Sequence, residues 1–115
     1  MITVIFELTP GEGQKDAYLG HAADLKPLLE KVPGFISVER FQSLTTPEKL
    51  LSLSFWESEE AVIAWRNTAE HRAAQSAARG GVLAGYRLRV AQVLRDYGHA
   101  IRGDVPEDSR DVHDI

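Results

Sequence analysis

Apolar and polar residues alternate along the first segment of the chain, and this period of two predicts a half-buried strand over residues 2–8. Pro10-Gly11 ends that strand. Residues 13–32 change to a helical period, with an apolar stripe at Tyr18, Ala22, Leu25, Leu29 and Val32. Pro27 lies inside this stripe, so we expect the helix to kink or break there.

The middle of the chain returns to strand patterns. Residues 35–43 and 49–56 each predict a strand, and the turn signal at residues 45–48 favours a hairpin between them. Ser58 then predicts the N-cap of a helix, because two glutamates follow it and suit the positive end of a helix dipole.

A second break in the pattern follows this helix. Asn67-Thr68 interrupts the apolar stripe, and Thr68 is expected to cap a second short helix that runs through Arg79 and stops at two glycines. Residues 82–97 then alternate over a length that is unusual for one strand. A strand of this length usually bends, bulges or reaches beyond its own subunit.

The order of these elements predicts an α+β fold of the ferredoxin-like β-α-β-β-α-β type. It would have a four-stranded antiparallel sheet with helices on one face. The other face needs a cover, and a second copy of the chain supplies one, so we expect a homodimer. Residues 1–97 would form the domain, and residues 98–115 a polar C-terminal extension.

Composition narrows the classes of function. The chain has 115 residues, a net charge of −4 and no cysteine. The acidic balance and the absence of basic runs argue against nucleic-acid binding, and no apolar stretch approaches the roughly 18 residues of a membrane span. The N-terminal residues MITVIFELTP have no basic flank and are too short for a signal peptide, so we expect a cytoplasmic protein.

The four histidines are candidates for metal binding and for catalysis. No two histidines have the four-residue helical spacing, beside a carboxylate, that a metal site favours, and we predict no metal. The chain also has no G-x-S-x-G elbow and no phosphate-binding glycine loop. The expected solvated surface histidines are His21, His99 and His113.

Trp65 and His71 are the most informative pair. Six residues correspond to roughly 240° around a continuous helix, so they would not share one face. The break at Asn67-Thr68 allows two helical pieces to aim both side chains into one pocket, with Gln75 one turn beyond His71. The alternative is that Trp65 is ordinary core packing and His71 a partly exposed helix residue.

The stretch from Phe55 to Tyr97 resembles the antibiotic biosynthesis monooxygenase family, which consists of small dimeric α/β barrels. The resemblance covers roughly residues 1–97. It rests on Trp65 and on three short motifs, Trp56-Glu57-Ser58-Glu59-Glu60-Ala61, Arg89-Val90-Ala91 and Arg95-Asp96-Tyr97.

The resemblance implies a pocket between the sheet and the helices. In phenol-oxidising members this pocket holds a flat aromatic substrate, and Trp65 and His71 match the family's pocket tryptophan and the residue near the substrate oxygen. The resemblance therefore implies a cofactor-independent monooxygenase of polycyclic phenols or quinols, with a small aromatic substrate and O2 as partners. Gln75 would bind the substrate, and candidates for the pocket walls are Phe6, Phe41 and Tyr86.

Two other readings stay open. Haem-degrading members use an Asn in the first strand, the same Trp, and a His ten residues after that Trp. This chain has no Asn in its first strand, and the tenth residue after Trp65 is Gln75 rather than a histidine. His71 lies one turn away and could substitute as a haem ligand. The other reading is a dimeric small-molecule-binding protein without catalysis, because a fold does not determine a function.

Cofactor-free oxygenation needs a substrate that becomes an electron donor once it loses a proton. His71 is the natural base, because its ordinary pKa near 6.5 leaves it mostly neutral at pH 7. Activity is then expected to rise through roughly pH 6–7. Trp65 would stack on the ring, and Gln75 would bind the developing anion. Catalysis is thus assigned to Trp65 and His71, with no cofactor.

Overall fold

The computed structural model describes residues 1–110, except for the side chains of residues 69, 70, 77, 78 and 110. The end of the predicted extension, with His113, lies outside the described residues. The elements are β1 (Ile2–Pro10), α1 (Lys15–Leu29), β2 (Phe35–Gln42), β3 (Leu50–Trp56), α2 (Glu59–Arg66), α3 (Ala69–Ala77), η1 (Ala78–Val82), β4 (Leu83–Gln92) and α4 (Glu107–Arg110).

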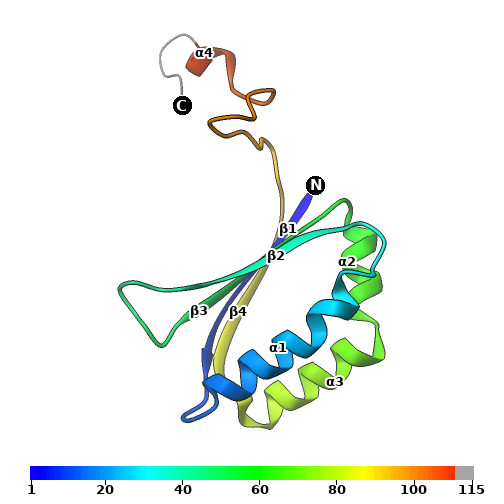
Figure 1. The fold of residues 1–115 in the computed structure, drawn as a ribbon, viewed down its shortest axis with the longest axis vertical. Coiled ribbons are helices and arrows are strands. Elements are labelled where there is room, and N and C mark those ends of the chain that lie inside the picture. The colour runs from blue at the N-terminus through cyan, green and yellow to red at the C-terminus, as the bar shows by residue number, and fades with distance from the viewer. Residues whose placement is uncertain (111–115) are drawn as a thin grey trace.

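The strands form one antiparallel sheet in the order β2-β3-β1-β4. Helices α1, α2 and α3 lie together on one face of this sheet, and the opposite face carries no helix of the domain (Figure 1). The predicted ferredoxin-like α+β fold is confirmed. The two βαβ units place both helical segments over the same face, and this arrangement creates the space in which the candidate site lies.

The core lies where the end of β3 meets α1 and α2. Trp56 is its centre, with 2% of its surface exposed, and its indole Nε1 donates to Ser54 Oγ at 2.9 Å. Phe35 packs edge-on against Trp56 at a ring distance of 5.3 Å. Trp65 and Leu29 belong to the same buried cluster, so this core anchors the helices to the sheet.

Helix α1 continues through Pro27 and ends at Leu29, so the proline does not break it where a break was expected. Only two helical residues follow the proline, which confines the loss of a backbone donor to the last turn. Leu29 is buried in the core cluster, and this packing favours completion of that turn.

Strand β4 ends at Gln92, five residues before the expected end at Tyr97. Its pairing with β1 ends there, since Ile2 pairs with Gln92 and the backbone N–H of Val93 donates to the carbonyl of Met1. Beyond Val93 no described strand pairs with the chain. Figure 1 shows that it leaves the sheet and runs as an arm to α4.

Candidate active site

A cavity of about 330 Å³ lies between the helical layer and the sheet. Its floor is the sheet face that carries alternate residues of all four strands. One row crosses the floor from β2 to β4 as Arg40, Ser52, Phe6 and Leu88, and a second as Val38, Ser54, Val4 and Val90. In the first row the floor is polar at β2 and β3 and apolar at β1 and β4, whereas in the second row only Ser54 is polar.

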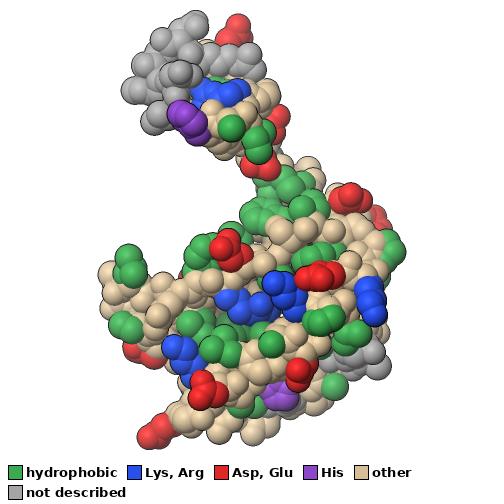
Figure 2. Space-filling model, viewed as in Figure 1, with side chains coloured by type: hydrophobic (Ala, Val, Ile, Leu, Met, Phe, Trp, Pro, Cys, Tyr) green, Lys and Arg blue, Asp and Glu red, His purple; other side chains and the backbone are tan. Residues whose placement is uncertain are grey.

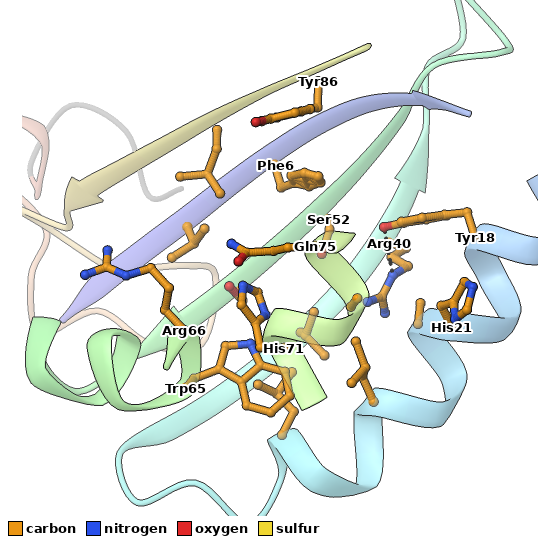
Figure 3. Close-up of a pocket in the computed structure, with 18 of the residues that line it drawn as sticks. Phe6, Tyr18, His21, Arg40, Ser52, Trp65, Arg66, His71, Gln75 and Tyr86 are labelled. Carbon is orange, nitrogen blue, oxygen red and sulfur yellow. Dashed lines mark hydrogen bonds between the residues drawn. The ribbon is translucent and has the colours of Figure 1, made fainter. Parts of the chain in front are cut away.

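Thr68 sets the bend between α2 and α3. Its Oγ1 donates to the carbonyl of Trp65 at 2.8 Å and accepts from the backbone N–H of His71 at 3.2 Å. This hydroxyl ends one helix and caps the next. The bend brings the rings of Trp65 and His71 within 5.4 Å of each other, and both line the cavity (Figure 3). The expected convergence of these two side chains is present.

Trp65 is both a core residue and a wall of the site. It is 9% exposed and belongs to the buried cluster around Trp56, yet it also lines the cavity. The two interpretations of Trp65 therefore describe different parts of one side chain.

The environment of His71 favours its neutral form. Partial burial lowers the pKa of this imidazole below its ordinary value, and the positive charges of Arg72 and Arg66 lower it further. The acidic limb of any reaction that needs the neutral imidazole therefore lies below pH 6.5, the ordinary pKa of histidine. The reason is tertiary, because burial is the largest cause of the shift.

Gln75 has one end held in place. Its Oε1 accepts from Arg72 Nη1 at 3.0 Å, and Arg72 Nη2 in turn donates to Asn67 Oδ1 at 2.7 Å. Because its carbonyl is engaged, the Nε2 donors of Gln75 are the group it can offer to a ligand. Figure 3 shows Gln75 and His71 pointing into the same space.

Five of the six residues predicted for the site line the cavity: Phe6, Trp65, His71, Gln75 and Tyr86. Phe6 and Tyr86 lie 5.6 Å apart between ring centres, and Tyr86 is 65% exposed, which places it at the mouth.

Phe41 is the exception, and its assignment as a pocket wall needs correction. It pairs with Leu51 on the sheet face away from the helices, is 43% exposed and does not line the cavity. Its neighbour Arg40 points to the cavity instead, because successive residues of a strand face opposite sides.

The sequence interpretation missed Arg40, Ser52 and Tyr18. The Nε of Arg40 donates to the hydroxyl of Tyr18 at 3.5 Å, and all three side chains line the cavity. Arg40 could have been found from the sequence, because it lies two residues after the apolar Val38 on β2 and therefore faces the same side of the sheet. His21 is exposed, as expected for a solvated histidine, and it also borders the cavity.

In the part of the chain that the structure describes, no three His, Asp or Glu side chains lie close enough together to hold a metal ion. The cofactor-free site stays a prediction. None of the described helices has the length and apolar composition needed to cross a bilayer.

The sequence profile of antibiotic biosynthesis monooxygenases matches residues 1–77, two thirds of the chain. The chain belongs to the antibiotic biosynthesis monooxygenase family. The match includes β1, the hairpin and the Trp65–His71 bend, so most of the cavity falls within the part that defines the family.

Two relatives extend this result. The chain is 48% identical over 93 residues to a jasmonate monooxygenase of Pyricularia oryzae, a match that covers 81% of this chain and 43% of that protein. It is 32% identical over 93 residues to the uncharacterised protein YqjZ of Bacillus subtilis, with 80% and 78% covered. The chain thus spans less than half the length of the Pyricularia oryzae protein.

Solved structures share the fold. A Deinococcus radiodurans protein assigned to the antibiotic biosynthesis monooxygenases superposes with a TM-score of 0.76 at 10% identity, covering 85% of this chain and 97% of that one. Rv0793 of Mycobacterium tuberculosis gives a TM-score of 0.75 at 13% identity, with 84% and 98% covered. At these identities the likeness concerns the fold alone.

Proposed function

We propose that this protein is a monooxygenase that oxidises a flat, multi-ring phenol or quinol with O2 and needs no cofactor. The observation that carries the proposal is the convergence of Trp65, His71 and Gln75 on one cavity whose floor is apolar at β1 and β4. The cavity volume of about 330 Å³ lies at the small end of the range of roughly 300–1,000 Å³ for small-molecule pockets, which suits a few fused rings.

The walls support an aromatic substrate. Phe6, Leu88 and Val90 give an apolar floor, and Trp65 offers an aromatic surface from the helical side. Flat rings pack well against such side chains in offset or edge-on arrangements. Tyr86 at the mouth adds a further ring that can cover a bound substrate.

His71 would act as the general base. Its lowered pKa keeps the imidazole neutral at pH 7, so a ring nitrogen can take the proton of a substrate hydroxyl. The Nε2 donors of Gln75 would then hydrogen-bond the anion that forms.

The oxygen step balances without an outside electron donor. The substrate anion gives its electrons to O2, and a bond forms between the substrate carbon and one oxygen atom. The carbon then loses its remaining hydrogen as a proton while the O–O bond breaks. One oxygen atom stays in the product as a carbonyl, the other leaves as water, and the substrate supplies all the electrons.

Family membership supports the reaction class. Because the Pyricularia oryzae relative is named a jasmonate monooxygenase, jasmonate should be tested as a substrate together with anthrone-like and hydroquinone compounds.

The direct test is oxygen uptake by the purified protein, with no added metal or flavin, followed by analysis of the product after reaction with labelled dioxygen. We expect uptake above the spontaneous rate, one labelled oxygen atom in the product, and a large loss in His71→Ala. Uptake at the spontaneous rate for every compound would contradict the proposal. A haemin titration with a sharp 1:1 endpoint, lost in His71→Ala, would favour the haem alternative instead.

A further inference from the structure

The formal charges on the described residues around the cavity are all positive. Among the described residues that line it are four cations, Lys26, Arg40, Arg66 and Arg79, and no Asp or Glu. The whole chain has a net charge of −4, so this is a local concentration of positive charge on an acidic protein. Figure 2 shows basic side chains gathered in the hollow between the sheet and the helices.

Arg40 differs from the other three cations in its position. Lys26, Arg66 and Arg79 are exposed, whereas Arg40 is partly buried on the sheet floor. Its Nε–H donates to the hydroxyl of Tyr18 (Figure 3), an arrangement that leaves both terminal nitrogens without a hydrogen-bond partner among the described residues. No described carboxylate pairs with it.

The opposite face of the sheet carries basic residues that do have a carboxylate partner. There Glu7 binds Arg89 at 3.0 Å and Lys49 at 3.5 Å. Arg40 lacks such a partner, and a partly buried cation without a counter-ion loses part of its hydration. A ligand carboxylate placed in the cavity would restore the missing interaction with two parallel hydrogen bonds.

We propose that the substrate of this site carries a carboxylate, which Arg40 binds while the aromatic body lies on the apolar half of the floor. The inference rests on the proposed function and adds the substrate class to it. Arg40 and Ser52 start the floor row that continues into Phe6 and Leu88, so an amphiphilic ligand has only one favourable orientation. The exposed cations at the rim attract the anion toward the mouth.

The test uses a pair of probes that differ only in charge, 6-hydroxy-2-naphthoate and its neutral carboxamide. Calorimetric binding is measured without turnover, in the absence of oxygen. We expect the wild-type protein to bind the carboxylate at least about tenfold more tightly, since each tenfold corresponds to about 1.4 kcal/mol, close to the lower end of what one charge-assisted hydrogen bond contributes.

Arg40→Gln should reduce this preference to near unity and leave carboxamide binding almost unchanged. Arg40→Lys keeps the charge but not the planar fork, so it should retain part of the preference. Arg95→Gln is the matched control, because it makes the same change in net charge at an exposed position that does not line the cavity. It should behave as wild type.

Two results would overturn the inference: equal preference in wild type and Arg40→Gln, both folded by circular dichroism, or no binding of either probe at millimolar concentration. The outcome is separable from that of the proposed function. Charge-dependent binding without oxygen uptake would leave the carboxylate site standing and remove the enzyme. Oxygen uptake with no effect of Arg40→Gln on the binding preference would support the enzyme and remove the carboxylate site.

Discussion

His71 is a single side chain whose chemistry depends on its surroundings. Burial disfavours its imidazolium ion most, and the positive charges of Arg72 and Arg66 disfavour it further. A general base that is neutral at the working pH is what proton removal from a phenol requires.

The pH dependence of activity follows from this shift. The pKa of His71 is lowered in the folded protein, so the neutral base persists as the pH falls to 6.5 and is lost only at lower pH. We expect the acidic limb of kcat/KM to lie below pH 6.5, and His71→Ala to lower the rate by about 10²–10⁴. Steady-state oxygen uptake from pH 5 to 8 measures both, and a limb at or above pH 6.5 would contradict the assignment.

The two tryptophans give a matched pair for stability. Trp56 is 2% exposed at the centre of the core, whereas Trp65 is 9% exposed and has the cavity on one side. Removing a fully packed Trp side chain costs about 3–5 kcal/mol, and less where the site already borders open space. Urea unfolding should therefore show a larger loss for Trp56→Ala than for Trp65→Ala. Equal losses would mean that Trp65 is only a core residue.

At the scale of elements, the break between α2 and α3 creates the site. A continuous helix would separate Trp65 and His71, and the hydroxyl of Thr68 prevents this by ending one helix and starting the next. Ser58 similarly begins α2 by accepting from the backbone N–H of Ala61 at 3.3 Å. Short polar residues thus decide where the functional side chains point.

Thr68→Val should show this effect, because valine keeps the shape of threonine but loses the hydroxyl. We expect a loss of about 1 kcal/mol in the free energy of unfolding, the usual cost of losing an N-cap. We also expect a lower kcat with an unchanged position of the acidic limb, since Thr68 acts by positioning His71. Thr68→Ser keeps the hydroxyl and should stay close to wild type. If serine and valine behave alike, the hydroxyl is not the cause.

At the scale of the whole molecule, the sheet face without helices is a surface to which the proposed function gives no role. It carries the ion group of Glu7, Lys49 and Arg89 and the apolar side chains of Ile5, Phe41, Leu51, Leu53 and Phe55. Apolar surface of this kind favours a partner, and a second copy of the chain remains the partner that we predict.

Light scattering should give twice the 12.8 kDa of one chain. Phe41→Glu places a charge on the helix-free face and should shift the protein toward monomer. Ile63→Glu is the matched control, since Ile63 is 39% exposed against 43% for Phe41 but lies on α2. A wild-type protein that stays monomeric at micromolar concentration would contradict the predicted dimer.

The order of elements, the caps at Ser58 and Thr68 and the convergence of Trp65 with His71 all followed from the sequence. These features depend on local rules: periodicity identifies strands and helices, and short polar residues begin helices. The resemblance to the family followed from the same local motifs. Local pattern was therefore sufficient for the fold and for the meeting of Trp65 and His71, whose roles stay a prediction.

Other features were decided only by the tertiary structure. Alternation shows that Arg40 and Phe41 face opposite sides of β2, but both faces of that strand carry apolar residues, so only helix packing selects Arg40 for the cavity. Strand β4 ends at Gln92, where its pairing with Ile2 of β1 ends. The lowered pKa of His71 comes from burial between elements distant in sequence. Each depends on which surfaces meet in space, and a one-dimensional pattern does not contain that information.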